Sequence, residues 1–371
     1  MRIAIDAHSA GTQLAGNATY ITSMIEALAK IDQENEYNVF VTKRSAYEQY
    51  KDRWPNFNVR RTLPHTPLIR IPITLTAELA RNPVDILFVQ YTAPPFVRCK
   101  VVTAIHDISY EHLPETFNRR SRFQMKLTIR YTAKRAAHIL APSEYSRQDI
   151  IDTYEIPADR ISTIPLAAPE FYRPITDQNE LERVRQKYGV GDSYILGVGS
   201  IQPRKNLVRL MEAYALLLIK KPEIPPLVLA GRKAWLSDET LEATAFRKIK
   251  HKVIFTGYVP DEDLPSLYSA ATCFIYPSFF EGFGLPPLEA MKCGTPVITG
   301  KLTSLPEVVG DAGLLVDPYS VEDIADKLDK MLGDPKLRGD LRDRGFRRAE
   351  EFSWERTARQ TLDIFERIAD K

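Results

Sequence analysis

Short apolar strands that alternate with helices, in two successive rounds, are the feature that most limits what this chain can fold into. In the first half, the strand Arg2–Asp6 runs into a loop with Gly11 and Gly16, and a helical pattern follows from about Ala18 to Lys30. In the second half the same order begins again with the strand Tyr194–Gly199. Strand, turn and helix in repeated order are typical of a doubly wound α/β domain with a parallel sheet. The sequence therefore predicts two such domains.

Length and the prolines in the middle of the chain indicate where one domain ends. A chain of 371 residues exceeds the size that one hydrophobic core usually serves. The strand Ile161–Ile164 is followed by the extended connection Pro165–Pro174, which prolines punctuate. Such a segment favours a linker between domains. We therefore place an N-terminal Rossmann-like domain at residues 1–170 and a C-terminal one at residues 171–354.

Composition and charge exclude several classes of protein. The residues are 44% hydrophobic and 26% charged, as in an ordinary globular protein, and the formal net charge of +2 does not indicate a nucleic-acid partner. The three cysteines, Cys99, Cys273 and Cys293, match neither a disulfide framework nor the spacing of a metal site. The sequence shows no signal peptide and no apolar run of about 18 residues, the length that spans a bilayer. We expect a protein of the cytoplasm, which is a reducing compartment.

A strand, a glycine-rich turn and a short helix follow one another ahead of Gly294. Cys273–Pro277 is typical of a buried strand that a proline ends, and Leu288–Cys293 is typical of a helix. Pro286 and Pro287 suit the first turn of that helix. The N–H groups of the turn and of the helix start can bind an anion such as a diphosphate. The residues of this turn are Gly282, Phe283, Gly284 and Leu285.

Two carboxylates bracket the glycine-rich turn. Glu281 precedes it, and we expect Glu289 in the first turn of the helix. Carboxylates accept hydrogen bonds and can grip paired hydroxyl groups, such as those of a ribose or a hexose. A diphosphate site beside two such groups predicts that a nucleotide sugar binds here. The alternative is a strand–turn–helix corner whose glutamates are solvated or cap the helix.

Two other strands deliver polar groups to their carboxyl ends, where open α/β sheets bind ligands. One buried strand ends in His106, and another leads from Gly199 to Arg204 and Lys205. An arginine can bind phosphate oxygens bidentately, and a lysine binds them as a point charge. The alternatives are a histidine that is buried and hydrogen-bonded for structural reasons, and basic residues that are merely exposed on a loop.

These residues together resemble a known family. The spacing of Glu281, the Gly-Phe-Gly turn and Glu289 resembles the signature of retaining glycosyltransferases of family 4, which have the GT-B fold. The Pro-Arg-Lys-Asn turn at Arg204 and the His-Asp pair at His106 are similar to features of the same family. The resemblance covers nearly the whole chain and is weakest from about Tyr37 to Leu79.

The resemblance implies a fold and a set of site residues. The fold would be α/β, with two doubly wound Rossmann-like domains that face each other across a cleft, and the last helix, residues 355–371, would cross back to the N-terminal domain. Gly16 would let the backbone approach the donor or the acceptor, and the loop at Val259 would lie against the nucleobase. The catalytic candidates are His106, Glu281, Arg204 and Lys205. The donor-binding candidates are Gly16, Ser200, Arg204, Lys205, Val259, Glu281, Gly282, Phe283, Gly284, Leu285 and Glu289.

The resemblance also implies a reaction. The chain would be a retaining, metal-independent glycosyltransferase that moves a hexose, with GDP-mannose as the first donor to consider, to a hydroxyl group of a glycan or lipid-linked acceptor in surface polysaccharide synthesis. The nucleotide sugar is a substrate, so no cofactor is expected. Retention would follow from same-face attack by the acceptor, and a covalent intermediate on Glu281 is the alternative. Two other functions fit the same fold: a nucleotide-sugar 2-epimerase, and a non-catalytic subunit that binds nucleotide sugars.

Three further segments allow more than one interpretation. Asp261, Glu262 and Asp263 match the D-x-D pattern of metal-dependent glycosyltransferases, but we expect Asp261 to cap a helix instead. The helix expected over Asn118–Ala137 could lie on anionic lipid headgroups or hold a diphosphate-linked lipid, or its basic side could simply face water. The segment Leu68–Ile73 could touch a membrane or pack as a loop. The basic stripe predicted on the long helix consists of Arg119, Arg122, Lys126, Arg130 and Lys134.

Overall fold

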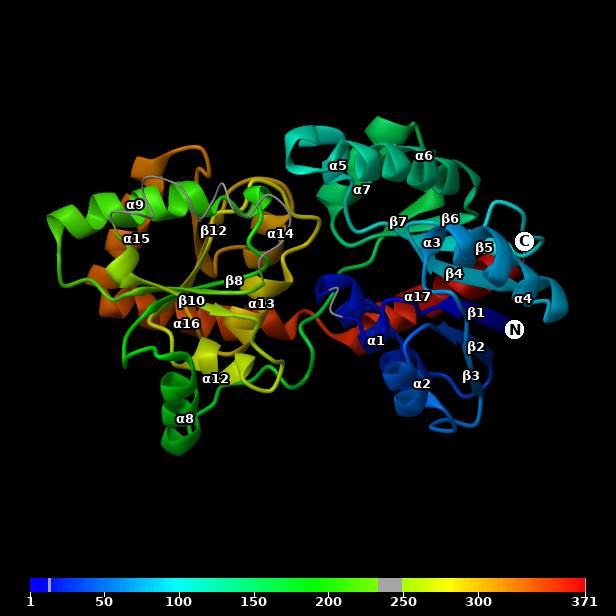
Figure 1. Cartoon of the computed structure of the whole chain (residues 1–371), viewed down its shortest axis with the longest axis horizontal. Coiled ribbons are helices and arrows are strands. Elements are labelled where there is room, and N and C mark those ends of the chain that lie inside the picture. The colour runs from blue at the N-terminus through cyan, green and yellow to red at the C-terminus, as the bar shows by residue number, and fades with distance from the viewer. Residues whose placement is uncertain (13–14, 233–248, 371) are drawn as a thin grey trace. The chain divides into compact units, whose positions relative to one another are not determined.

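The computed structural model describes residues 1–12, 15–232 and 249–370, whose elements Figure 1 labels. The chain divides into two compact units. Unit 1 comprises Met1–Glu111, Arg119–Leu166 and Ser353–Lys371, and unit 2 comprises His112–Asn118 and Ala167–Phe352. The division after Leu166 lies close to residue 170, where the sequence placed the boundary.

Unit 1 is built on a parallel sheet whose strand order is β3-β2-β1-β4-β5-β6-β7. Its inner strands are buried along almost their whole length, as expected for a sheet that is covered on both faces. The strands are β1 (Arg2–Asp6), β2 (Glu36–Val41), β3 (Phe57–Arg61), β4 (Ile86–Gln90), β5 (Lys100–Ala104), β6 (His138–Ala141) and β7 (Ile161–Thr163). The helices that accompany them are α1 (Ala15–Ile31), α2 (Arg44–Tyr50), α3 (Pro67–Ile69), the π-helical turn η1 (Arg70–Leu75), α4 (Thr76–Arg81), α5 (Ser109–His112), α6 (Arg119–Arg135), α7 (Glu144–Tyr154), η3 (Ala158–Arg160) and α17 (Trp354–Ala369). The 3₁₀ turn η2 (Pro114–Thr116), which lies between α5 and α6 in the chain, belongs to unit 2.

Unit 2 repeats this plan with the strand order β10-β9-β8-β11-β12-β13. The strands are β8 (Ile195–Val198), β9 (Leu227–Ala230), β10 (Val253–Gly257), β11 (Cys273–Tyr276), β12 (Val297–Gly300) and β13 (Gly313–Val316). The described helices are α8 (Gln178–Tyr188), the 3₁₀ turn η4 (Pro203–Lys205), α9 (Leu207–Lys220), η5 (Lys250–Lys252), α12 (Leu264–Ser269), α13 (Leu285–Lys292), α14 (Leu305–Val309), α15 (Val321–Gly333) and α16 (Pro335–Glu350). The predicted pair of doubly wound parallel sheets is confirmed.

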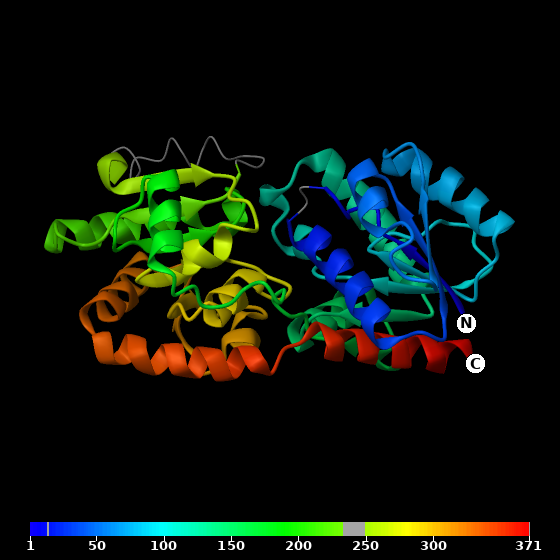
Figure 2. The same cartoon turned by 90° about the horizontal axis from the view of Figure 1, so that it is seen from below.

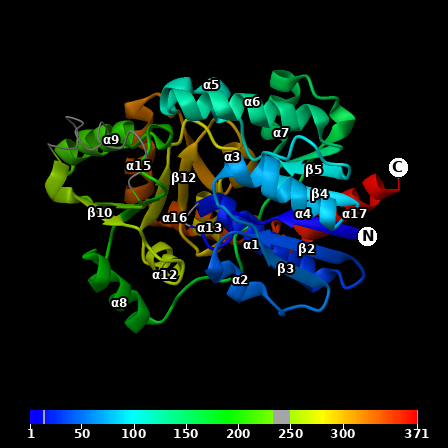
Figure 3. The same ribbon diagram turned by 45° about the vertical axis from the view of Figure 1, so that its right-hand side comes forward.

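The core of unit 2 joins its sheet to two helices that lie side by side, α9 and α15 (Figures 1 and 3). Leu210, Tyr214 and Leu217 recur at helical spacing along α9 and meet Leu328 of α15 and Ile275 of β11 in one buried cluster. Burial of these side chains holds the strands of unit 2 in place. The carboxyl ends of the strands, which bear the candidate site, are thereby fixed as well.

The order of the strands reverses at the same place in both sheets. The first strand of each unit, β1 or β8, lies between the strand that follows it and a strand from later in the chain, β4 or β11. Ligands of open α/β sheets bind outside the carboxyl ends of the strands at such a reversal. In unit 2, β8 and β11 pair in parallel, with Cys273 opposite Ile195. The turns that follow these two strands therefore start from the same edge of the sheet.

The last helix belongs to unit 1, and the predicted return of the chain to the N-terminal domain is confirmed. Figure 2 shows α17, in red, running alongside α1, in blue. Ser353 caps α17, because its Oγ accepts the N–H of Arg356 at 3.2 Å. Phe365 is fully buried and its ring packs on that of Phe88 at 5.4 Å between centroids. Residue 371, which the predicted helix included, lies outside the described residues.

The five basic residues predicted to form a stripe share one side of α6, but three of them are engaged within unit 1, where Lys134 Nζ lies 3.4 Å from a carboxylate oxygen of Glu155. Arg122 is half-buried, and its Nε donates to the carbonyl oxygen of Tyr110 at 2.9 Å. Lys126 Nζ lies 2.5 Å from a carboxylate oxygen of Glu111. These two residues therefore hold α6 onto its own unit. The exposed members of the stripe are Arg119, Arg130 and Lys134.

Candidate active site

Two turns that the sequence singled out lie together at the carboxyl ends of β8 and β11. The turn η4 follows β8, and the segment that starts at Pro277 follows β11. The N–H of Phe279 donates to the carbonyl oxygen of Arg204 at 3.0 Å. Asn206 Nδ2 donates to the carbonyl oxygen of Pro277, also at 3.0 Å. These hydrogen bonds tie the basic turn to the glycine-rich segment.

A third strand end packs against the basic turn. Gly231, which follows β9, has a φ of +154°, and a Cβ at this position would lie 1.9 Å from the carbonyl oxygen of Gly199. Because no side chain fits into that distance, only glycine allows the two backbones to approach so closely. Gly199 and Gly231, which follow β8 and β9, thus allow the ends of these two strands to come together.

The carboxylate of Glu281 lies between the two basic residues of η4. Its oxygens are 2.6 Å from Lys205 Nζ and 3.1 Å from Arg204 Nη1. Ser278 Oγ donates to the same carboxylate at 2.6 Å. The side chains of Glu281, Lys205 and Arg204 are only 9%, 11% and 15% exposed, so their charges are largely withdrawn from water. The site is therefore a compact cluster of two cations and one anion.

The charges of this cluster decide the protonation of Glu281. Burial would raise the pKa of Glu281, but Arg204 and Lys205 outweigh burial and hold the pKa at about 2, below the ordinary value of 4.5. The hydrogen bonds from Lys205 and Ser278 act in the same direction. Glu281 is thus a carboxylate at neutral pH, and the cluster keeps one positive charge in excess.

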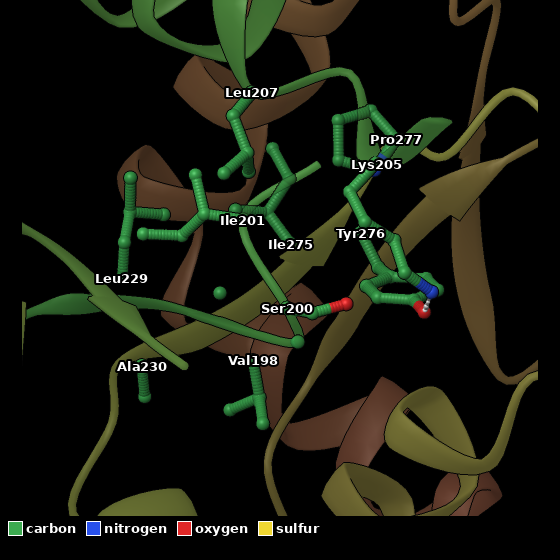
Figure 4. A pocket seen from close by; sticks show the side chains of 12 residues that line it. Val198, Ser200, Ile201, Lys205, Leu207, Leu229, Ala230, Ile275, Tyr276 and Pro277 are labelled. Atoms are coloured by element: carbon green, nitrogen blue, oxygen red, sulfur yellow. Dashed lines mark hydrogen bonds between the residues drawn. The ribbon is translucent and has the colours of Figure 1, made fainter. Parts of the chain in front are cut away.

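A small cavity lies between the ends of β8, β9 and β11 (Figure 4). Its volume of about 20 Å³ can hold a water molecule. In Figure 4 the ammonium group of Lys205 meets the hydroxyl group of Tyr276, to which it donates a hydrogen bond. The same ammonium group lies 4.7 Å from the centroid of the Tyr276 ring. Tyr276 and Glu281 together therefore fix the position of Lys205.

Buried contacts also shape the glycine-rich turn that leads into α13. Ser304 Oγ lies 2.8 Å from the carbonyl oxygen of Glu281 and 2.7 Å from that of Phe283. Since Ser304 is fully buried, two carbonyl groups of the turn are held on its inner side. Gly284 has a φ of +122°, a conformation that side chains disfavour. The turn thus depends on glycine at this position.

Two prolines limit what the start of α13 can offer to an anion. Pro286 and Pro287 occupy its first turn, as predicted, and a proline has no N–H group. The donors left for the predicted anion site would then be the N–H group of Leu285 and those of the turn at Phe283 and Gly284. The predicted anion site would therefore depend on the turn more than on the end of the helix, and it stays a prediction.

The sequence predicted Glu289 in the first turn of the helix, which is wrong. Glu289 lies in the second turn of α13, because the helix begins at Leu285. The fixed φ of proline suits the first helical turn, so the helix starts ahead of both prolines and includes them. The carboxyl group of Glu289 accepts a hydrogen bond from the Tyr268 hydroxyl group at 2.9 Å. Burial raises the pKa of Glu289 to about 7, and Asp261 adds to this, while the bond from Tyr268 opposes it. Glu289 therefore titrates near neutral pH.

The other donor-site candidates of unit 2 also follow strand ends. Ser200 follows β8 and lines the cavity, and its Oγ accepts a hydrogen bond from Gln202 Nε2 at 3.0 Å. Val259 follows β10 and is buried. The structure thus collects Ser200, the basic turn, Glu281 and the glycine-rich turn at neighbouring strand ends of one sheet.

His106, a catalytic candidate, belongs to unit 1 and follows β5. Its ring packs edge-on against those of Tyr20 and Tyr91, at 4.4 and 5.5 Å between centroids. Its Nε2 is buried and has no hydrogen-bond partner among the described residues. Burial lowers the pKa of His106 to about 4, against the opposing effect of Asp107. The imidazole is therefore neutral at physiological pH.

Gly16 also belongs to unit 1, but not to the loop in which the sequence placed it. The helix α1 begins at Ala15, so Gly16 lies in its first turn. Glycine adopts helical dihedral angles as well as loop ones, so its presence did not reveal where the loop ends. A Cβ at Gly16 would meet no atom within 4 Å. Its predicted role in the approach of a ligand stays a prediction.

Comparison with known proteins identifies the family. Residues 15–168 match "Glycosyltransferase Family 4", and residues 178–348 match "Glycosyl transferases group 1". Over 267 residues the chain is 41% identical to O-antigen chain mannosyltransferase B of Escherichia coli, a match that covers 72% of this chain and 70% of that protein. The chain belongs to glycosyltransferase family 4.

The glycosyltransferase is also similar to a longer protein and to a solved structure. Serotype-specific mannosyltransferase WbdA of Escherichia coli is 35% identical over 241 residues, which make up 63% of this chain and 29% of WbdA. The structure of HepE of Anabaena in complex with UDP-glucose superimposes with a TM-score of 0.75 at 19% identity and covers 99% of both chains. At this identity the likeness shows the fold alone, and the predicted GT-B fold is confirmed.

The second aspartate of the D-x-D pattern of this glycosyltransferase, Asp263, is buried and forms ion pairs with two partly exposed basic residues. Asp263, not Asp261, directly precedes α12, so the helix cap predicted at Asp261 is wrong. The carboxylate of Asp263 lies 2.6 Å from Arg183 Nη2 and 2.5 Å from Lys187 Nζ, both on α8. These contacts keep Asp263 inside the unit, and the helix starts only after it. Across the part of the chain that the structure describes, no group of three or more His, Cys, Asp or Glu side chains could hold a metal ion.

Sequence reasoning missed the side chains that support the two glutamates of the glycosyltransferase. Ser278 donates to Glu281, and Tyr268 donates to Glu289. Ser278 stands between a strand-ending proline and the candidate site, which is a local signal that could have found it. Tyr268 lies on α12, and nothing in the sequence around it points to a carboxyl group on α13. Its role follows from tertiary packing alone.

Proposed function

We propose that this glycosyltransferase moves mannose from GDP-mannose to a hydroxyl group of a glycan or lipid-linked acceptor, in the cytoplasm and during the synthesis of a surface polysaccharide. The transfer would retain the anomeric configuration and need no metal ion. Identity of 41% with an O-antigen chain mannosyltransferase supports mannose as the sugar. The observation that carries the proposal is the cluster of Arg204, Lys205 and Glu281 beside a glycine-rich turn. Such a cluster suits a diphosphate donor.

The diphosphate would bind to Arg204, Lys205 and the N–H groups of the turn at Phe283 and Gly284. The excess positive charge of the cluster attracts an anion, and electrostatic attraction is stronger in a largely buried site than in water. An entering diphosphate would compete with Glu281 for its two cations. The carboxylate would then turn to the hydroxyl groups of the sugar, which are hydrogen-bond donors that it can accept.

The nucleoside would bind on the other side of the turn. Glu289 would accept hydrogen bonds from the ribose hydroxyl groups, and the loop at Val259 would lie against the base. Tyr268 holds the carboxyl group of Glu289 in place, so its oxygen atoms are oriented before the nucleoside arrives. A carboxyl group that is already oriented loses less conformational entropy when the ribose binds, and so contributes more to affinity.

Cleavage of the bond between sugar and phosphate places negative charge on the departing diphosphate. Arg204, Lys205 and the N–H groups of the turn would stabilise that charge, and loss of one such donor typically lowers the rate by ~10²–10³-fold. The acceptor hydroxyl group would attack from the face that the diphosphate leaves and give its proton to the leaving phosphate. His106, which is neutral at physiological pH, would position the sugar.

The protonation of Glu281 argues against two other roles. With a pKa of about 2, Glu281 carries no proton at neutral pH and cannot act as a general acid. With Lys205 at 2.6 Å and Arg204 at 3.1 Å, its carboxylate lies beside the groups that would bind the departing diphosphate, whereas a covalent nucleophile attacks from the opposite face of the sugar. Same-face attack without a covalent intermediate is therefore the mechanism that we propose.

A thermal-shift screen with GDP-mannose, UDP-glucose and ADP-glucose tests the donor. A ligand at 100 times its Kd adds about 2.7 kcal/mol to stability by mass action, enough to raise Tm by several degrees. We expect the largest rise with GDP-mannose. UDP-sugars are the second candidate, because the similar fold of HepE was solved with UDP-glucose. If none of the three raises Tm, the nucleotide-sugar proposal fails.

NMR spectroscopy of GDP-mannose with the protein alone separates the rival functions. A transferase would slowly release GDP and mannose that is initially the α-anomer, at a rate that EDTA does not change. A 2-epimerase would instead produce GDP-glucose, and a non-catalytic binding subunit would leave the donor intact. The comparisons name transferases and do not favour the epimerase. Release of β-mannose, or loss of activity with EDTA, would contradict the retaining, metal-independent mechanism.

A further inference from the structure

A row of large apolar side chains lies open to solvent on α6 of unit 1. Phe123, Leu127 and Tyr131 are 71%, 63% and 40% exposed. Their spacing of four residues places them on one side of the helix, in a row about 12 Å long. Three exposed large apolar residues in succession on one helix face are unusual for a side that meets only water.

Arginines flank this row on both sides. At 100° per residue, Arg119 and Arg130 fall on one border of the row and Arg135 falls on the other. All three are exposed, and the guanidinium group of Arg135 lies 5.3 Å from the centroid of the Tyr131 ring. The sequence from Thr116 to Ser143 contains no acidic residue. By the same projection the exposed Arg120 and Lys134 lie beyond the two ends of the row. The outer face of α6 is therefore apolar along its middle and positively charged along its edges and at its ends.

Neighbouring segments extend the apolar surface. The Tyr131 hydroxyl group donates to the carbonyl oxygen of Pro95 at 3.3 Å, which places the next residue, Phe96, close to the row. Phe96 is 80% exposed. Leu75 and Ala93 share one buried cluster, so η1 lies on the other side of this loop. The exposed apolar residues around η1 are Leu63, Leu68, Ile69 and Ile73.

A buried ion pair holds η1 so that these residues stay outside. Arg70 is completely buried, and its Nη1 lies 2.6 and 2.8 Å from the two carboxylate oxygens of Asp6 at the end of β1. With Arg70 directed inward, Ile69 and Ile73 remain 45% and 62% exposed. The apolar surface is therefore a feature of ordered elements, anchored to the sheet of unit 1.

We propose that the outer face of α6, with the adjacent loop at Phe96, docks on the surface of a bilayer that contains anionic lipids. A helix with an apolar row and basic borders can lie in the interface, with the row among the acyl chains and the arginines at the lipid phosphates. Exposed arginines on a helix that itself carries no acid complement such a surface, because each basic residue near it contributes to binding. Arg122 and Lys126, which are bound within unit 1, would keep α6 parallel to the membrane rather than join it.

Co-sedimentation with vesicles tests this docking surface. The full-length protein is mixed with vesicles of phosphatidylcholine alone, or with about 30% phosphatidylglycerol, at ~0.1 M salt. We expect sedimentation only with the anionic vesicles. Phe123→Ser with Leu127→Ser should lower the partition coefficient at least ~10-fold, because two apolar side chains no longer enter the interface. Arg119→Gln with Arg130→Gln should lower it about fivefold for each arginine removed.

Matched variants of unit 2 control for general effects of substitution. Ile219→Ser removes an apolar side chain that is 81% exposed, and Arg342→Gln with Arg347→Gln removes two exposed arginines of α16. Both controls should sediment like the wild type, and every variant should melt within ~2 °C of it, since surface changes rarely cost more than ~0.5 kcal/mol.

Three outcomes would overturn the proposal. One is equal sedimentation of the wild type with neutral and anionic vesicles, or with neither. Another is a Phe123 and Leu127 double variant that binds anionic vesicles as well as the wild type. The third is a wild type that dimerises in analytical ultracentrifugation and a double variant that is monomeric, without vesicle binding by either. The face would then be an interface between two copies of the chain.

Discussion

Lys205 and Glu281 form an ion pair whose energy can be measured. The pKa of Glu281 falls from an ordinary 4.5 to about 2, although burial acts in the other direction. A shift of this size corresponds to about 3 kcal/mol in favour of the folded state with a charged Glu281. Because Glu281 is only 9% exposed, solvent screens this interaction little. We expect Lys205→Met and Glu281→Gln each to lower the free energy of unfolding by roughly 2–3 kcal/mol.

A double-mutant cycle isolates the pair. The variant that carries both substitutions should be destabilised by roughly 2 kcal/mol less than the sum of the single effects. In the double variant neither charge of the Lys205–Glu281 pair is left buried without the other. The free energies would come from urea unfolding followed by circular dichroism at pH 7. The exposed pair of Lys221 and Asp329, at 2.5 Å in the same unit, is the control, and its coupling should stay below about 1 kcal/mol.

The pH dependence of the same cycle has a definite sign. The folded pKa of Glu281 lies below its unfolded value, so its contribution is complete above about pH 4.5 and is lost as the pH falls towards 2. The wild type should therefore lose stability over this range relative to Glu281→Gln. Single effects that simply add within ~0.5 kcal/mol at pH 7 would refute the view that Lys205 compensates a buried charge.

Three more results are expected. Arg204→Ala with Lys205→Ala should weaken GDP binding by roughly 100-fold in calorimetry and guanosine binding hardly at all, because only GDP carries the diphosphate; equal losses would exclude the phosphate role. The pKa of Glu289 in the folded protein is about 7, above its ordinary 4.5, so the folded state loses stability as the pH rises between these values. The unfolding free energy of the wild type, measured relative to Glu289→Gln, should therefore fall by about 3 kcal/mol from pH 4.5 to 7. A difference between the two proteins that does not change with pH would contradict the burial of Glu289. Gly231→Ala should lower the free energy of unfolding by more than ~3 kcal/mol, since the new Cβ would lie 1.9 Å from a carbonyl oxygen. The control is Gly339→Ala on α16, whose Cβ would meet no atom within 4 Å, and this change should be neutral or stabilising.

The regular elements with clear local signals could be predicted from the sequence. The strand Arg2–Asp6 has the predicted bounds, because it is a short apolar run that ends at a polar residue. The strands Val253–Gly257 and Gly313–Val316 follow the same kind of apolar pattern, next to glycine. The helix Glu144–Tyr154 begins directly after a serine, a residue type that favours helix starts, and Ser143 Oγ accepts the N–H of Ser146 at 3.0 Å. In these cases local chemistry and tertiary structure agree.

What the sequence could not reveal depends on contacts between distant residues. The π-helical turn Arg70–Leu75 looked like a loop or a membrane segment, and its conformation is tied to the ion pair of Arg70 with Asp6, which lies 64 residues away. The site shows the same limit. The sequence predicted which turns matter, but not that Glu281 would rest against Lys205 and Arg204, since no local pattern encodes a partner 76 residues away in the chain.

The membership of α17 in unit 1 has a consequence for biosynthesis. A ribosome completes the strands of unit 1 by residue 163, but the helix that carries Phe365 and covers Phe88 leaves the exit tunnel only after all of unit 2. Apart from His112–Asn118, which is made earlier, unit 2 is one continuous segment and can fold co-translationally from residue 167 onward. Until α17 is made, unit 1 keeps an uncovered apolar patch. A protein cut after residue 352 would retain a complete later half and an earlier half prone to aggregation.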